Sequence, residues 1–238
     1  MTESETIETP EAMLVPVDTS ETFTNDTVFN LDSRHLAVDF ILTLHTSVGQ
    51  KLFSGEWKPG KMGLRQFARC IQVLWEAFEQ DDPYAEWQLL KIHEAMQALK
   101  LTLQDHEKKL NKQVRSLRTM HIKAFRNKKP LLVSMTSVDT LTLSAANLIT
   151  QMDYLTRLLL TIKQLGLIPV MPVRLQVLCE EIQTLFMLSE AWKKTGIRRQ
   201  DILDATPKAK KIEKQRGTLP DEILYQKATL PFLFLEAS

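Results

Sequence analysis

Basic side chains form two dense clusters in this 238-residue sequence, and phosphate binding is the chemistry that such clusters support. The first cluster runs from Lys108 to Lys129 and the second from Lys193 to Arg216. Each Lys or Arg can neutralise a nucleic-acid phosphate. A solvated helix face followed by a lysine-rich loop has the same composition, so both interpretations stay open at this point.

The charge is distributed unevenly along the chain. Residues 1–32 contain eight acidic residues and no Lys or Arg, whereas the whole chain has a formal net charge of +1. The remainder therefore has 30 basic and 21 acidic residues, a net charge of +9. Because Thr, Ser, Pro and acids dominate the N-terminal stretch, we expect residues 1–36 to form a disordered acidic arm. This arm could cover a basic cluster and compete with polyanions, and removing residues 1–32 would then change the affinity for them.

Residues that could do catalytic or metal chemistry lack the spacing that such chemistry needs. His93-Glu94 comes nearest to a zinc motif, but Gln97 stands where the second histidine is required. Cys70 and Cys179 each lie in an apolar helical pattern, which is typical of buried thiols in a reducing compartment. No Walker loop, dinucleotide fingerprint or nucleophile elbow occurs. We therefore expect no enzyme, no catalytic residue, no metal and no cofactor.

The elements at the start of the basic body are predicted to be a strand and two helices. Apolar and polar residues alternate over 37–46, which predicts the only clear strand. A short helix follows over 47–55, and a second begins near residue 62 and ends before residue 82. One face of the strand should be buried against these helices, and its residues are Phe40, Leu42 and Leu44.

Two longer segments have apolar residues at heptad spacing. One opens with Asp82 as N-cap and Pro83 as the first helical residue, and the other spans 141–162. The simplest packing of the two is a long antiparallel hairpin. The basic loop 121–137 would join them, with at most one extended segment. Further helices are predicted over 175–192 and from Thr206-Pro207 onward.

These elements predict four parts of the chain. They are the acidic arm 1–36, a strand-helix-helix module 37–81, a helical domain 82–225 that includes the basic loop, and an apolar C-terminal tail 226–238. The tail either docks on the core or binds a partner protein. No stretch is long and apolar enough to cross a bilayer, and no secretion signal is present, so a cytoplasmic location without membrane contact is expected.

Two motifs carry a resemblance to a known family. They are QDDPYAEWQLLKIHEA at residues 80–95 and TGIRRQDI at residues 195–202, and Gly166-Leu167-Ile168 also fits. The chain resembles, over residues 37–225, the AcaB-like family of integrative and conjugative element proteins. That family is regarded as a branch of ribbon-helix-helix regulators. The resemblance therefore implies a homodimeric, double-stranded DNA-binding transcription regulator of a conjugative element that serves horizontal gene transfer.

The resemblance also implies a fold and a reading surface. The expected fold is mainly α, with a ribbon-helix-helix-like strand-helix-helix segment followed by the heptad-patterned hairpin and further helices. In such a dimer the paired strands of two chains enter the major groove of DNA. The outward strand face then makes Thr43 and His45 the expected base contacts. Asp39 and Ile41 share that face and no Lys or Arg does, so an ordinary, partly buried strand stays as the alternative.

Phosphate contacts are expected at the start of the second helix and in the basic loop. Uncapped amides at a helix start attract phosphate, and basic side chains flank them here. A solvated turn would use the same residue types. The full set of expected contacts is Lys58, Lys61, Met62, Gly63, Arg65, Lys128 and Lys129.

A second function remains open beside DNA binding. The chain could be a non-enzymatic helical scaffold or accessory protein of conjugative transfer, with the hairpin and the apolar tail as protein-binding surfaces. Sequence preference in DNA binding discriminates between the two, because a regulator shows it and a scaffold does not.

Overall fold

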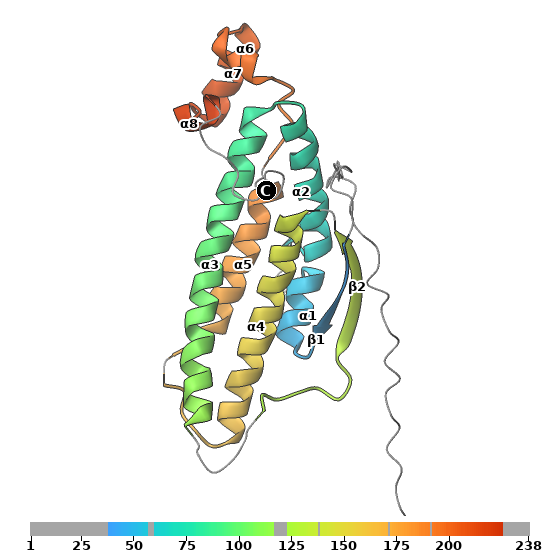
Figure 1. Ribbon diagram of the computed structural model, residues 1–238, viewed down its shortest axis with the longest axis vertical. Helices are drawn as coiled ribbons and strands as arrows, with labels where there is room; N and C mark the ends of the chain where they lie inside the picture. Colours follow the sequence, from blue (N-terminus) through green and yellow to red (C-terminus); the bar gives the residue numbers. More distant parts are fainter. Residues whose placement is uncertain are drawn as a thin grey trace, which may run out of the picture. The chain divides into compact units, whose positions relative to one another are not determined.

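The computed structural model describes residues 38–56, 60–116, 123–137, 139–170, 172–190 and 192–225 (Figure 1). All of these belong to one compact unit, Arg34–Ser238. The predictions for the acidic arm and the apolar tail concern residues outside the described part of the chain. No helix among the described residues is long and apolar enough to span a membrane.

The prediction of a mainly helical fold is confirmed. The elements follow one another as β1 (Val38–Leu44), α1 (Ser47–Ser54), α2 (Leu64–Glu79), α3 (Pro83–Arg115), β2 (Leu131–Ser137), α4 (Thr140–Gln164), α5 (Leu175–Glu190), α6 (Arg199–Leu203), α7 (Pro207–Arg216) and α8 (Asp221–Leu224). The chain order of β1, α1 and α2 is the predicted strand-helix-helix.

Local signals explain where several helices begin and end. The Thr46 side chain accepts a hydrogen bond from the Gly49 amide at the start of α1, and Gly55 ends that helix with a φ of 83°. Asp82 accepts from the amides of Tyr84 and Ala85 at the start of α3. These caps satisfy backbone groups that a helix cannot pair internally.

One hydrophobic core joins α1–α5 and the inner face of the sheet. The apolar stripe of α3 faces this core, and the Phe67 ring of α2 stacks on the Phe186 ring of α5 with centroids 4.7 Å apart. Helices α3, α4 and α5 lie side by side in the bundle (Figure 1), and α2 packs against all three. The stripe of α3 consists of Leu89, Ile92, Met96, Leu99, Leu103 and Leu110.

The predicted antiparallel hairpin of α3 and α4 is wrong, because the two helices run in the same direction (Figure 1). Gln113, near the end of α3, hydrogen-bonds the Ile168 carbonyl and the Val170 amide just after α4 at 2.6 and 3.0 Å. The prediction assumed that the loop turns straight back. Instead the connection, which includes β2, returns along the bundle, and at about 3.3 Å per extended residue its length suffices to run back beside α4.

The expectation of a single strand that pairs only with a second copy is corrected as well. Strand β1 pairs antiparallel with β2 of the same chain, and Leu44 lies opposite Leu131. The extended segment expected in the basic loop is therefore a full partner strand. Because the strands alternate, Leu42, Leu44 and Val133 face the core.

Replacing Gln183 by methionine should stabilise the fold. Gln183 is fully buried in α5, and neither amide atom has a hydrogen-bond partner among the described residues. Burying an unpaired amide costs about 1–3 kcal/mol, whereas methionine has similar length and no polar hydrogen to satisfy. We expect the free energy of unfolding, measured in urea, to rise by about 1 kcal/mol. A decrease of that size would show that the amide is satisfied.

The two cysteines should differ in reactivity. Burial raises the pKa of the Cys179 thiol to about 12. Burial also raises the pKa of the half-buried Cys70, with the Ser189 hydrogen bond opposing. Because the thiolate is the reacting form, a thiol reagent at pH 8 should label Cys70 first, and Cys179 only as fast as the protein unfolds. Rapid labelling of Cys179 in the native protein would contradict its burial.

Candidate nucleic-acid interface

The outward face of the β1–β2 sheet is a narrow surface of hydroxyl and apolar side chains. Thr43 of β1 lies opposite Leu132 of β2, and Ile41 lies opposite Ser134. All four are exposed, with exposed fractions of 69% for Ile41 and 64% for Leu132. Hydroxyls can donate to or accept from base edges, and apolar groups can contact a thymine methyl. The face therefore has the chemistry to read bases.

The carboxylate on this face is paired within the sheet. Asp39 lies opposite Thr136, and the Thr136 hydroxyl donates a hydrogen bond to Asp39 Oδ1 at 2.5 Å. The pair fixes the far end of the ribbon. This hydrogen bond also occupies one oxygen of the Asp39 carboxylate, the group on this face whose negative charge repels phosphate.

A buried carboxylate in α4 holds the other end of β1. Asp153 is 1% exposed and accepts hydrogen bonds from the Thr46 amide at 2.8 Å, the Thr46 hydroxyl at 2.7 Å and the His45 amide at 3.1 Å. A Cβ on Gly49 would lie 2.7 Å from Asp153 Oδ1, so the close approach requires glycine there. Asp153 thus fixes the turn between β1 and α1, and with it the position of Thr43.

A groove lies between α1, the start of α2 and β2, with a volume of about 610 Å³. Two exposed basic residues line it, Lys51 from α1 and Arg65 from α2. The Arg65 guanidinium carbon lies 5.6 Å from the centre of the Phe53 ring, which orients the side chain. On the β2 side the lining is Leu131, Leu132, Val133 and Ser134, so the groove adjoins the outward face of the sheet.

Residues 123–129, just before β2, are rich in basic side chains and are anchored to α4. Lys123, Arg126, Lys128 and Lys129 are exposed. The Phe125 amide donates to the Thr161 hydroxyl of α4 at 2.7 Å, and Arg157 Nε donates to the Phe125 carbonyl at 2.5 Å. Burial lowers the pKa of Arg157, an effect that nearby Asp153 opposes, and the guanidinium stays charged at neutral pH. Cations therefore stand at the end of the sheet where β2 begins.

The expected site residues occupy different environments. Thr43, Lys61 and Arg65 are exposed. His45 is half-buried, and its Nδ1 is buried without a hydrogen-bond partner among the described residues. Lys58 lies outside the described residues.

Met62 and Gly63 are buried, in contrast to their flanking cations. A Cβ on Gly63 would lie 2.5 Å from the Phe53 carbonyl oxygen, because the start of α2 packs against the end of α1. The accessible groups at this helix start are therefore the side chains of Lys61 and Arg65. Sequence analysis did not find Lys51, Ser134 or Asp153, since their roles depend on pairing and packing between distant segments.

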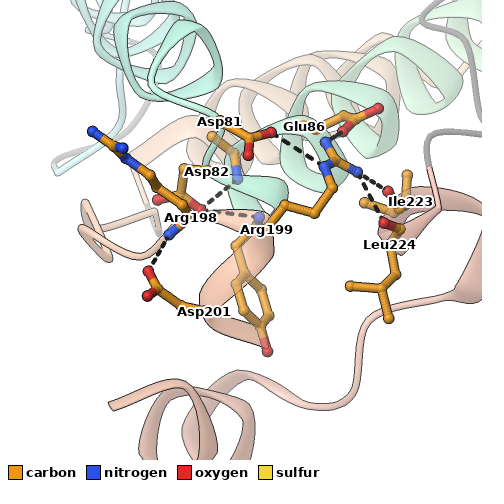
Figure 2. A network of polar contacts seen from close by, with 10 residues as sticks. Asp81, Asp82, Glu86, Arg198, Arg199, Asp201, Ile223 and Leu224 are labelled. Atoms are coloured by element: carbon orange, nitrogen blue, oxygen red, sulfur yellow. Dashed lines mark hydrogen bonds and ion pairs between the residues drawn. The ribbon is translucent and has the colours of Figure 1, made fainter. Parts of the chain in front are cut away.

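The two family motifs meet in a separate polar cluster (Figure 2). Arg199 Nη2 donates to Glu86 Oε2 at 2.6 Å, and Arg199 Nε donates to Asp81 Oδ1 at 3.2 Å. Arg199 Nη1 donates to the Ile223 carbonyl. Thr195 Oγ1 donates to Asp82 Oδ2 at 2.5 Å. The guanidinium is engaged on both edges, so this cluster joins α6 and α8 to the start of α3 and leaves no free fork for a phosphate.

No group of three or more potential metal ligands occurs in the described part of the chain. The interface consists of hydrogen-bonding, apolar and basic side chains around a two-stranded ribbon, with the acidic Asp39 on the outward face and Glu56 in the lining of the groove. That arrangement suits recognition of a polyanion by direct contact.

Comparison with known proteins gives one family and one related structure that bear on this arrangement. Residues 33–231 match the family model described as transcriptional regulator AcaB. A crystal structure of AcaB from uropathogenic E. coli is similar in fold, with a TM-score of 0.50 and 13% sequence identity over 82% of this chain and 98% of that one. No curated protein matches. Because the family model spans most of the sequence, the chain belongs to the AcaB family of transcriptional regulators.

Proposed function

We propose that this protein regulates transcription by laying the outward face of its β1–β2 ribbon into the major groove of double-stranded DNA. The observation that carries the proposal is the exposed row of Thr43, Ser134, Ile41 and Leu132 on a ribbon bordered by cations. The major groove admits a two-stranded ribbon, and each base pair presents a distinct pattern there. A ribbon without Lys or Arg reads bases through hydroxyl and methyl contacts.

The bordering cations would contact phosphates on either side of the groove. Lys128 and Lys129 stand at the start of β2, and Lys51 and Arg65 line the adjacent groove. Lys58 and Lys61 extend the same group in the sequence. Such contacts set the register and supply most of the salt-dependent affinity, while the ribbon supplies sequence preference.

The homodimer and the conjugative-element setting are part of this proposal and rest on the family resemblance. Both strands of the ribbon come from one chain, so a dimer would present two ribbons rather than one shared ribbon. Two-fold symmetric regulators bind half-sites about one helical turn, roughly 35 Å, apart. The regulated genes would then be those of the host element, and the operator a pseudo-palindrome.

The base-reading role is tested with promoter fragments from the host element in fluorescence anisotropy. Thr43→Ala combined with His45→Ala should reduce the preference for the operator over random DNA, by about 1–3 kcal/mol for each base that the variant no longer recognises. Binding to random DNA should change little. A wild-type protein without sequence preference would instead support a scaffold role and contradict the proposal.

The phosphate role is tested by Lys128→Gln combined with Lys129→Gln. Affinity should fall by a similar factor on operator and random DNA, and the slope of log K against log salt should decrease by about 2, or roughly 0.9 for each phosphate that is no longer neutralised. The matched control is Lys108→Gln with Lys112→Gln, which removes two exposed lysines of α3. Equal changes in both variants would show a general charge effect.

A further inference from the structure

Helix α7 presents a face of lysines at the end of the molecule where α3 begins. Lys210, Lys211 and Lys214 are exposed, and at 100° per residue they fall within an arc of about 100° on the helix. Lys193 and Lys194 on the preceding loop are exposed as well. None of the five has a side-chain hydrogen bond or ion pair to another described residue.

The orientation of this lysine face is fixed by packing on its opposite side. Ala209 is buried and Ile212 packs against a small core of Tyr84, Ile197, Leu219 and Ile223. Tyr84 Oη donates to the Gly217 carbonyl at 2.9 Å. The face is therefore held rigidly rather than displayed on a free tail.

Two other cations of this region have structural partners. Arg216 Nη2 donates to the Lys193 carbonyl at 2.5 Å, and Lys208 donates to the Gly196 carbonyl. Both contacts tie the 192–198 loop to α7. Arg216 and Lys208 therefore have a structural role, whereas the five lysines remain available to bind a ligand.

Repulsion among the lysines of this face destabilises α7 as an isolated helix. Lys210 and Lys214 are four residues apart, and Lys211 and Lys214 are three apart, spacings at which like charges repel. The one acidic residue in α7, Glu213, is partly buried and lies away from the centre of this face. The nearby acidic residues, namely Asp201 of α6, Asp204 just after it, and Asp221 and Glu222 of α8, form no ion pair with these lysines. A bound polyanion would relieve the repulsion.

We propose that Lys210, Lys211 and Lys214, with Lys193 and Lys194, form a second binding surface for the phosphate backbone of duplex DNA, separate from the ribbon. Lysines act as point charges that suit contacts independent of sequence. The apolar side of α7 is buried, so the helix does not have the free apolar face that membrane binding requires. The proposal extends the proposed function, because the same DNA or a second segment would be held at both surfaces.

The two surfaces are far enough apart to lengthen the contact with DNA. The α7 region is joined to the start of α3, whereas the basic segment before β2 is anchored to the C-terminal half of α4, beside the end of α3. Helix α3 has 33 residues and is about 50 Å long. That length corresponds to about 15 base pairs of B-DNA at ~3.4 Å each.

The test uses the full-length protein and a random duplex of about 40 base pairs, which is longer than both surfaces together at ~3.4 Å per base pair. For Lys210→Gln, Lys211→Gln, Lys214→Gln, the salt slope should decrease by about 2–3, and affinity near 0.1 M salt should fall about 10- to 100-fold. The operator preference should stay as in wild type. Circular dichroism checks that the triple variant folds.

The control is Lys108→Gln, Lys109→Gln, Lys112→Gln, which removes three exposed lysines from α3. An unchanged slope for the α7 variant, or an equal decrease in the control, would overturn the second surface. The Lys128→Gln, Lys129→Gln variant, measured alongside, separates the two proposals. If only that variant weakens binding, the α7 surface fails and the ribbon site stands. If only the α7 variant does, the phosphate contacts beside the ribbon fail instead.

Discussion

Replacing Arg199 by methionine is expected to lower the free energy of unfolding by about 3–5 kcal/mol. Arg199 is 8% exposed, and its main partner Glu86 is 4% exposed. Without the guanidinium, the Glu86 carboxylate and the Ile223 carbonyl have no donor in a buried site. The ion pair to Asp81 contributes less, because that carboxylate is half exposed. Urea denaturation followed by circular dichroism gives the change.

A double variant separates the effect of the ion pair from the effect of packing. Arg199→Met combined with Glu86→Met removes both buried charges, and should recover a large part of the stability that Arg199→Met alone removes. The neighbour Arg198 is exposed, so Arg198→Met should change stability by less than about 0.5 kcal/mol. An Arg199→Met protein as stable as the wild type would contradict a structural role for the polar cluster around Arg199.

Replacing Asp153 by alanine is expected to cost about 3 kcal/mol of stability and to weaken DNA binding as well. The substitution leaves the buried Thr46 amide without its acceptor and removes the partner of the His45 amide. A buried donor left unpaired costs about 1–3 kcal/mol. Because Asp153 fixes the turn that follows Thr43, the effect should reach the reading face. Urea denaturation and anisotropy with operator DNA measure the two effects.

Asp153→Asn provides the milder comparison. It keeps one acceptor oxygen but removes the negative charge, so about half of the stability loss is expected. Asp105→Ala is the matched control, since Asp105 is an exposed helical acid whose one ion pair among the described residues is with Lys109. Hydrogen exchange should be faster at the His45 and Thr46 amides in Asp153→Ala than in the wild type, and unchanged there in Asp105→Ala. Unchanged exchange in Asp153→Ala would contradict the anchoring role.

Local signals in the sequence were sufficient to predict where several helices begin or end. The Asp82-Pro83 and Thr206-Pro207 starts and the Gly55 end depend on neighbouring residues only, and the structure has all three. The alternation over 37–46 likewise predicted which side chains of β1 face outward. These features follow from side-chain chemistry within one or two turns.

Contacts between distant segments could not be predicted in the same way. His45 and Asp153 are 108 residues apart, and Glu86 and Arg199 are 113 apart. Asp153 follows Met152 in the apolar stripe of α4, and nothing in its neighbours indicates that it receives donors from another segment. The direction of α4 was predicted incorrectly for the same reason. The sequence of a loop does not specify whether the chain turns straight back after it or first runs along the bundle.

The central claim, that the β1–β2 ribbon enters the DNA groove, is tested most directly by photocrosslinking. A benzophenone-bearing residue replaces Ser134 on the outward face of the ribbon, or Val177 on the exposed side of α5 as the control. We predict crosslinks to operator DNA from position 134 that excess unlabelled operator abolishes, and none from position 177. Crosslinks from position 177, with none from position 134, would contradict the account.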